Sequence, residues 1–277
     1  MLWKKVTVIL MLTMLLFSCM QSRHRASGKR YVITSPEIAE IVCLLEGADN
    51  IVGITTECDY PEYLKSKEII GNFGKVDFEK IIKLDPSVVF TAGLEQESLA
   101  EELQKLSIKT EKIHSKSWQQ MLNSILKIGV IIDREERSIF VVDSLQLELE
   151  EISRSNYNPE VYVEIYNNPI MSVSDSSFVG QLVALAGGKN IFEKLPRDYS
   201  RVDPELVIKA DPEVILITYP DITISDIKNR KGWEVISAVQ NERVYTVKDV
   251  NPDLILRASP RVISGIKELQ KVFYESK

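Results

Sequence analysis

The chain has 277 residues, 44% of them hydrophobic and 27% charged, which lies within the range of globular proteins and excludes disordered, collagen-like and polytopic membrane chains. This length allows one large domain or two ordinary ones, with a core that needs no disulfide or metal. The net charge of −6, with three Cys and two His, excludes a phosphate-binding basic surface and a cysteine-rich metal site, so we expect no nucleic-acid partner.

The first residues predict an export signal. Two lysines precede the apolar run 6–17. This run is shorter than the roughly 20 residues that span a bilayer but fits a signal peptide. It ends in Ser18 and Cys19, which resembles the acylation site of bacterial lipoproteins; an ordinary signal peptide with an incidental Cys is the alternative. We predict a signal peptide at 1–18, then lipidated Cys19 within a flexible polar tether at 19–29.

Strand and helix patterns alternate in the next segment, 30–116, which predicts an N-terminal α/β lobe. Its short apolar runs fit strands that are buried on both faces, as in a parallel sheet. The expected strands are 31–34, 51–54, 88–91 and 112–114, and the expected helices are 36–46, 78–84 and 97–106.

The segment 117–155 predicts a helical connector. From Ser117 to Ser153 it has no proline and one glycine, and it is rich in Leu, Ile, Glu, Gln and Lys. We expect helices at 117–131 and 134–153, with Asp133 as the N-cap between them. Such a connector forms a stiff joint between two lobes.

The last segment, 156–277, repeats the α/β alternation and predicts a C-terminal lobe. Together the two lobes predict an α/β fold with mostly parallel sheets and a ligand cleft between the lobes. The expected strands are 161–166, 214–218 and 244–247, and the expected helices are 178–186, 204–209, 232–239 and 260–274.

An internal repeat links the two lobes. Residues 76–90 (VDFEKIIKLDPSVVF) and 202–216 (VDPELVIKADPEVIL) are identical at eight of fifteen positions, at a constant offset of 126. In each copy an N-cap Asp precedes a short helix, and an Asp-Pro pair ends it before an apolar strand. The repeat therefore predicts two equivalent helix–strand units.

The repeat also supplies matched side chains. Glu79 and Glu205 fall in the first turn of the two helices, and Phe73 and Tyr199 stand six residues before them. The carboxylates are either helix-dipole partners or a symmetric pair that engages a partner with two equivalent halves. The aromatic rings either pack beneath their own loops or clamp a bulky ligand.

No other motif supplies a catalytic nucleophile or base. His114 at an expected strand end is the single His outside the leader and tether, and Gly187-Gly188 fits a helix C-cap. Asp253 and Arg257 bracket an expected loop, where they form either an i,i+4 ion pair or ligand contacts. Cys43 and Cys58 form either a disulfide, which export permits, or two free thiols. The residues alone therefore propose no nucleophile or base and leave an enzyme open.

These features together resemble a known family. The lipoprotein signal, the D-x-E-x-x-x-x-x-D-P-x-V repeat, Asp59-Tyr60-Pro61, the segment 186–192 (AGGKNIF) and the segment 257–261 (RASPR) are similar to the substrate-binding proteins of bacterial ABC importers for metal chelates. The resemblance covers about residues 31–273. It implies two Rossmann-like lobes joined by a long rigid helix, with the ligand held between them.

The resemblance also implies roles for single residues. Glu79 and Glu205 dock the protein onto a dimeric permease. The cobalamin-binding branch of the family implies ligand contacts from a set drawn from both lobes: Tyr60, Phe73, Tyr166, Met171, Tyr199, Asp253 and Arg257. Two positions depart from that branch, since Glu57 replaces a tyrosine and Ala92 a tryptophan.

The expected function is therefore capture of cobalamin outside the cytoplasm and its delivery to an ABC permease and ATPase. We expect the protein to be monomeric and lipid-anchored, not to be an enzyme, and to have no cofactor or metal of its own. A ferric siderophore is one alternative ligand, for which the candidate cations are Lys75, Arg197, Arg201 and Arg257. Haem is another, with Tyr60 or Tyr199 as iron ligand. A chelatase-like enzyme on the same fold and a surface adhesin or sensor without a permease are alternatives of other classes.

Overall fold

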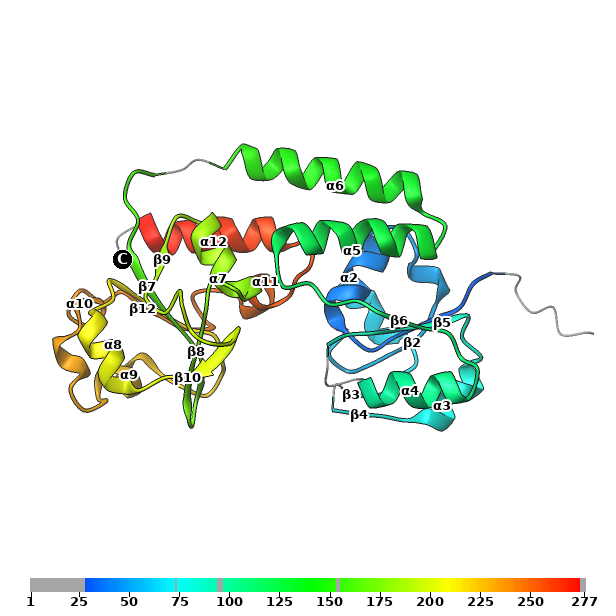
Figure 1. The fold of residues 1–277 in the computed structure, drawn as a ribbon, viewed down its shortest axis with the longest axis horizontal. Coiled ribbons are helices and arrows are strands. Elements are labelled where there is room, and N and C mark those ends of the chain that lie inside the picture. The colour runs from blue at the N-terminus through cyan, green and yellow to red at the C-terminus, as the bar shows by residue number, and fades with distance from the viewer. Residues whose placement is uncertain (1–27, 73, 94–96, 153–154, 275–277) are drawn as a thin grey trace, which may run out of the picture.

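The computed structural model describes residues 28–72, 74–93, 97–152 and 155–274 and forms two α/β lobes bridged by helices (Figure 1). The predicted fold class is confirmed. Cys19 and Phe73 lie outside the described residues. No helix within the described ranges has the length and apolarity needed to cross a bilayer.

The N-terminal lobe contains a four-stranded, all-parallel sheet with the order β2-β1-β5-β6. Its two central strands are buried along their whole length, as the apolar runs predict. The strands are β1 (Tyr31–Ile33), β2 (Ile51–Ile54), β5 (Val88–Thr91) and β6 (Thr110–Lys112), with the separate ribbon β3 (Gly71–Asn72) and β4 (Lys75–Val76). The helices are α2 (Pro36–Leu44), η1 (Ala48–Asn50), η2 (Glu62–Ser66), α3 (Phe78–Leu84) and α4 (Glu97–Lys105).

The C-terminal lobe contains a mixed six-stranded sheet with the order β10-β8-β7-β11-β12, in which β9 also pairs with β7. The strands are β7 (Glu160–Asn167), β8 (Ile170–Val173), β9 (Lys189–Asn190), β10 (Tyr199–Arg201), β11 (Val214–Ile217) and β12 (Val244–Tyr245). The helices are α7 (Phe178–Leu185), α8 (Pro204–Ala210), α9 (Ile224–Lys228), η3 (Trp233–Val235), α10 (Ser237–Gln240), α11 (Pro252–Leu256) and α12 (Val262–Tyr274). Its β7–β8–β10 part is antiparallel.

The internal repeat of the sequence is also present in the structure. Helices α3 and α8, and strands β5 and β11, begin and end at positions that differ by 126. Asp77 accepts a hydrogen bond from the Lys80 amide at 3.1 Å, and Asp203 accepts one from the Glu205 amide at 3.0 Å. Both aspartates are thus the expected N-caps.

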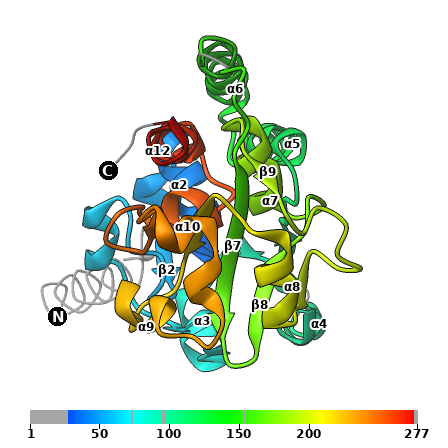
Figure 2. The same cartoon turned by 90° about the vertical axis from the view of Figure 1, so that its left-hand side faces the viewer.

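Two helices, α5 (Trp118–Ile131) and α6 (Glu135–Glu150), connect the lobes. They pack closely because Gly129 leaves room for Ser138, whose Oγ lies 2.3 Å from where a Cβ would stand. Figure 2 shows α6 at the outer edge of the molecule, beyond α5 and α12. The predicted N-cap was wrong: Arg134 occupies that position, while Asp133 adopts a φ of 57° and pairs with Lys29 at 2.7 Å.

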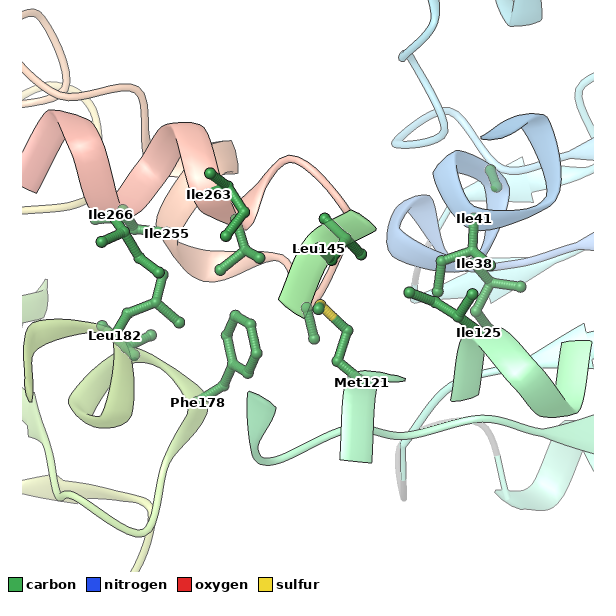
Figure 3. Close-up of a cluster of buried hydrophobic side chains, with 14 of the residues drawn as sticks. Ile38, Ile41, Met121, Ile125, Leu145, Phe178, Leu182, Ile255, Ile263 and Ile266 are labelled. Atoms are coloured by element: carbon green, nitrogen blue, oxygen red, sulfur yellow. The ribbon is translucent and has the colours of Figure 1, made fainter. Parts of the chain in front are cut away.

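The lobes share one apolar core. In Figure 3, Ile38 and Ile41 of α2 and Met121 of α5 lie on one side, and Phe178 and Leu182 of α7 lie on the other. Residues of α6 and α12 join the same cluster. Burial of each such side chain contributes about 1.5–3 kcal/mol, so separating the lobes at this point would be costly.

Several predicted elements were wrong in their bounds or kind. The helix expected at 232–239 is divided into η3 and α10, and the strand expected at 112–114 lies two residues earlier. The loop expected between Asp253 and Arg257 is the short helix α11. Strands β8 and β10 were not predicted, since neither has a long apolar run.

Candidate functional site

One group of predicted ligand residues gathers on the β7–β8–β10 hairpins. Tyr166 lies opposite Met171, and Met171 lies opposite Arg201 in the antiparallel register. Tyr199 lies two residues before Arg201, on the same side of β10. We call these four residues the hairpin face. Because Tyr166 and Tyr199 are 50% and 44% exposed, the hairpin face presents two aromatic side chains at the surface.

A β-bulge explains how Tyr166 reaches this face. The register of β7 against β8 shifts between Glu164, opposite Ser172, and Tyr166, opposite Met171. Two residues of β7 therefore lie opposite one residue of β8, and Tyr166 points to the face of the sheet opposite that of Glu164. Without the bulge Tyr166 would share the buried side with Glu164.

Glu164 anchors the reverse side of the same sheet. Its fully buried carboxylate accepts two hydrogen bonds from Arg230, at 2.6 and 2.7 Å, and one from the Tyr162 hydroxyl at 2.8 Å. The Tyr219 hydroxyl also donates to it. Burial, together with the negative charge of Glu164, raises the pKa of both tyrosines. The network leaves no charge uncompensated at the base of the hairpin face.

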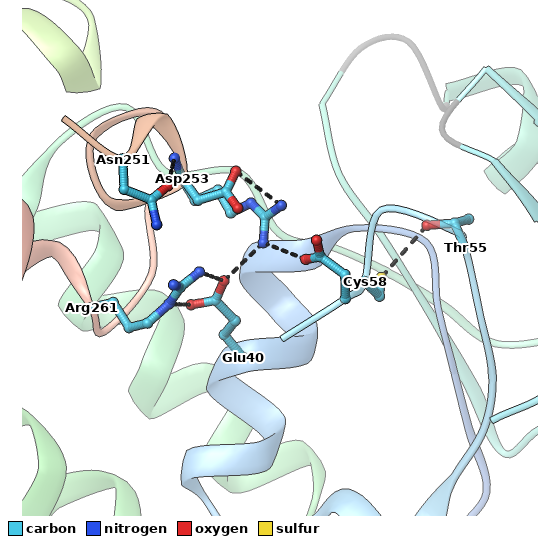
Figure 4. A network of polar contacts seen from close by, with 8 residues as sticks. Glu40, Thr55, Cys58, Asn251, Asp253 and Arg261 are labelled. Carbon is cyan, nitrogen blue, oxygen red and sulfur yellow. Dashed lines mark hydrogen bonds and ion pairs between the residues drawn. The ribbon is translucent and has the colours of Figure 1, made fainter. Parts of the chain in front are cut away.

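A second group lies where the lobes meet. We call Glu40, Asp59, Asp253, Arg257 and Arg261 the junction cluster (Figure 4). Arg257 forms ion pairs with Glu40 at 3.2 Å and with Asp59 and Asp253 at 3.0 Å each. Arg261 holds Glu40 through two hydrogen bonds, at 2.6 and 2.8 Å. The i,i+4 pair considered from the sequence is thus present, within a larger network.

The cluster fixes the charge state of its arginines. Burial of Arg257 opposes its charged form, but the carboxylates of Asp59, Asp253 and Glu40 outweigh this effect and raise its pKa. Hydrogen bonds to Glu40 raise the pKa of Arg261 in the same way. Both guanidinium groups are therefore already engaged by carboxylates before any ligand binds.

Tyr60 stands beside this cluster. The guanidinium of Arg261 lies 3.9 Å from the centre of its ring, and the ring is 46% exposed. Tyr60 and Arg261 also line a groove of about 490 Å³ between α2, α6 and the start of α12. The structure thus places Tyr60 with Asp253 and Arg257, and Tyr166 with Met171 and Tyr199, in two separate groups.

Glu79 and Glu205 occupy matching places. Each is the second residue of its helix, α3 or α8, and each is exposed. Among the described residues neither carboxylate has an ion-pair partner. Figure 1 shows α3 and α8 in opposite lobes, on the side away from α6. The pair is available to a partner that contacts both lobes.

The remaining candidate residues, two cysteines and one histidine, provide little evidence for a functional site. Cys43 and Cys58 are free thiols, and burial raises the pKa of Cys58 to about 12. His114 is exposed just beyond β6. No group of three or more His, Cys, Asp or Glu within the described ranges has the arrangement of a metal site.

Sequence reasoning missed Glu40 and Glu164. Each is a glutamate in the buried middle of a largely apolar element, in PEIAEIVCL of α2 and EVYVEIYN of β7, and a second glutamate stands near the start of each element. A charge at a buried position requires a partner, and this signal was present in the sequence. The arginine partners were not identifiable, because they lie 66 and 221 positions away.

Two α/β lobes, a helical connector and exposed side chains where the lobes meet are the architecture of a two-lobed binding protein. The chain belongs to the Periplasmic binding protein family, which matches residues 32–251. The family resemblance seen in the sequence is thereby confirmed.

Known proteins extend this result. An uncharacterized ABC transporter substrate-binding lipoprotein of Bacillus subtilis is 27% identical over 257 residues, covering 89% of this chain and 80% of that protein. A vitamin B12-binding protein of Vibrio vulnificus is 24% identical over 269 residues, 94% of each. The crystal structure of a possible iron-binding periplasmic protein of Staphylococcus epidermidis matches with a TM-score of 0.79 and 25% identity, covering 89% of this chain and 98% of that one. The chain is thus similar to transport proteins along most of its length.

Proposed function

We propose that this protein is a lipid-anchored binding protein that captures a corrinoid of the cobalamin class and delivers it to a dimeric ABC permease with its ATPase. The family and the transport relatives support the binding role. The hairpin face supports the ligand class, because its two exposed tyrosine side chains and Met171 offer apolar contact area to a large macrocycle beside the single charge of Arg201. The protein performs no chemistry on its ligand.

The junction cluster favours a ligand with neutral polar groups. Three carboxylates face two guanidinium groups, so the cluster carries one excess negative charge. This excess lies outward, where the side chains of Asp59 and Asp253 are 45% and 38% exposed. The amide side chains of a corrinoid can donate hydrogen bonds to these carboxylates, whereas carboxylates of a ligand would be repelled.

Calorimetric titration of the full chain in detergent with cyanocobalamin tests the proposal. We expect one-to-one binding with a micromolar or tighter Kd, weakened at least tenfold by Tyr166→Ala or Tyr199→Ala. Tyr157→Ala is the matched control, because Tyr157 is 47% exposed but lies before the start of β7. Equal loss in the control, or no cobalamin binding, contradicts a corrinoid on the hairpin face. Release of metal from bound cobalamin would instead indicate a chelatase-like enzyme.

A ferric chelate with carboxylates, such as a siderophore or haem, is the second candidate. Arg201 belongs to the hairpin face, Arg197 lies four residues before it, and Lys75 holds the equivalent repeat position in the N-terminal lobe. In the part of the chain that the structure describes, none of the three has an ion-pair partner. Arg201→Gln separates the candidates. It should weaken an anionic chelate at least tenfold and leave cyanocobalamin within twofold.

The lipid anchor needs its own test. Cys19 lies outside the described residues, so its acylation rests on the sequence. Mass spectrometry of the protein from its native membranes should show a mature chain that begins at acylated Cys19. A Cys19→Ala variant should be released from membranes. An unmodified Cys19 would leave an exported protein without an anchor.

A further inference from the structure

We infer that Glu40 is the positioning residue that holds the two lobes, and the proposed ligand contacts at their junction, in one arrangement. The inference rests on the proposed function only for the ligand contacts. Glu40 lies in α2 of the N-terminal lobe and is 4% exposed. Its Oε2 accepts from Arg261 Nε, and its Oε1 accepts from Arg261 Nη2 and Arg257 Nη1. Both arginines belong to the C-terminal segment, so one carboxylate joins the lobes.

The contacts of Glu40 extend to one proposed ligand residue in each lobe. Arg257 is held directly, at 3.2 Å. Tyr60, in the N-terminal lobe, is held through Arg261, whose planar guanidinium both grips Glu40 and lies 3.9 Å from the ring centre. A lysine in place of Arg261 would supply the positive charge, but not the two N–H donors that hold Glu40 or the planar surface that stacks on Tyr60. Rotation of one lobe against the other would therefore break the Glu40 contacts and displace both ligand residues.

The inner and outer parts of the junction cluster differ in exposure. The side chains of Glu40 and Arg261 are 3% and 20% exposed, whereas Asp59 and Asp253 reach solvent. Water and salt compete with the outer carboxylates but have little access to the inner pair. The inner pair therefore sets the lobe orientation, while the outer carboxylates remain able to exchange Arg257 for a ligand group.

The inter-lobe distance provides a readout that does not depend on the ligand. Spin labels at Lys83→Cys and Lys209→Cys occupy equivalent exposed positions of α3 and α8, one in each lobe. A Cys43→Ser background removes the more accessible native thiol, and Cys58 is buried and unreactive at neutral pH. Pulsed electron resonance then reports the distribution of distances between the lobes.

We expect Glu40→Gln to broaden or shift this distribution and to weaken cyanocobalamin binding at least tenfold. Glu37→Gln, one turn earlier on α2, should change neither. A residue that only stabilised the fold would lower the melting temperature and leave the distance distribution unchanged below it. An unchanged distribution in Glu40→Gln therefore overturns the inference.

Two further observations keep the test decisive. If Glu40→Gln does not fold, Arg261→Lys retains the charge and removes the fork, and it should broaden the same distribution; an unchanged distribution there also overturns the inference. If the wild-type chain binds no cobalamin, the proposed ligand is wrong. A broadened distribution in Glu40→Gln still supports the role of Glu40 in lobe orientation.

Discussion

The two copies of the internal repeat form the same local structure in different surroundings. Helices α3 and α8 both have seven residues, and both end at an aspartate with left-handed backbone dihedral angles, Asp85 or Asp211. The strand before α3 pairs in an isolated two-stranded ribbon, whereas β10 before α8 extends the six-stranded sheet. Local sequence thus determines the helix–strand unit. The β7–β8 hairpin, which the C-terminal lobe alone provides, determines that the strand before α8 joins the main sheet.

The surroundings also change the burial of an identical residue. Ile82 and Ile208 occupy the same repeat position, but Ile82 is 48% exposed while Ile208 is partly buried and packs in the second core of the C-terminal lobe. Asp211 accepts two hydrogen bonds from Ser237, at 2.6 and 2.9 Å, which join the end of α8 to the start of α10. The C-terminal copy is therefore the more enclosed of the two.

The largest effect on binding should follow from reversing the charge of the glutamate that both copies retain. The double variant Glu79→Lys and Glu205→Lys should reduce binding to the cognate permease at least 100-fold, about 2.7 kcal/mol, because both helices would then present cations. The measurement is association with transporter-containing membrane vesicles. Ligand affinity should stay within twofold.

Single variants sharpen the comparison of the lobes. If the partner has two equivalent halves, Glu79→Lys and Glu205→Lys should cause similar losses, and Lys83→Glu with Lys209→Glu should cause smaller ones. A loss confined to one copy would contradict symmetric docking. Full binding by the double variant would leave the two carboxylates as helix-dipole partners only.

The largest effect on stability concerns the buried charge that belongs to the C-terminal lobe alone. Glu164→Gln should destabilise the C-terminal lobe by about 3–5 kcal/mol, since Arg230 loses its carboxylate in a buried network. Calorimetry should show a melting temperature lower by roughly 10 °C. Glu160→Gln is the control on the same strand, because its pair with Lys189 is exposed and contributes less than about 1 kcal/mol. Equal effects would contradict the assignment of Glu164 as the anchor.

A smaller difference should separate the two isoleucines. Ile208→Ala removes a side chain that packs against its neighbours and should cost about 2 kcal/mol, whereas Ile82→Ala should cost less than about 1 kcal/mol. Urea denaturation of both variants measures the difference. Equal costs would show that the repeat position, and not its surroundings, determines the contribution of the residue.

The sequence was most informative where structure is local. The repeat predicted α3 and β5 at their observed bounds, because caps and apolar runs act over a few residues. Strand β8 depends on pairing with β7, and β10 depends on pairing with β8. The five residues of α11 are too few for a periodic pattern. The junction cluster joins Glu40 to Arg261, 221 positions apart, and no local rule selects that pair.

The smallest effect concerns acid stability at two ion-pair sites, with one carboxylate in each lobe. In the N-terminal lobe, burial of Glu111 disfavours its charge, but Lys109 and Lys127, each at 3.2 Å, outweigh it and lower its pKa. In the C-terminal lobe, Lys116 at 2.7 Å lowers the pKa of Asp198. Both pKa values lie below those of the unfolded chain, so each contribution is fully present above about pH 4 and is lost as pH falls through the folded value.

These lysines are half exposed, so each contribution should be less than about 1 kcal/mol. Glu111→Gln and Asp198→Asn should each lower the free energy of unfolding at pH 7, and the difference from wild type should shrink by pH 3. Urea titrations at both pH values provide the measurement. A difference that is constant between pH 7 and pH 3 would mean that the carboxylates act as neutral hydrogen-bond partners. Because two lysines serve Glu111 and one serves Asp198, the larger pH-dependent loss should belong to the N-terminal lobe.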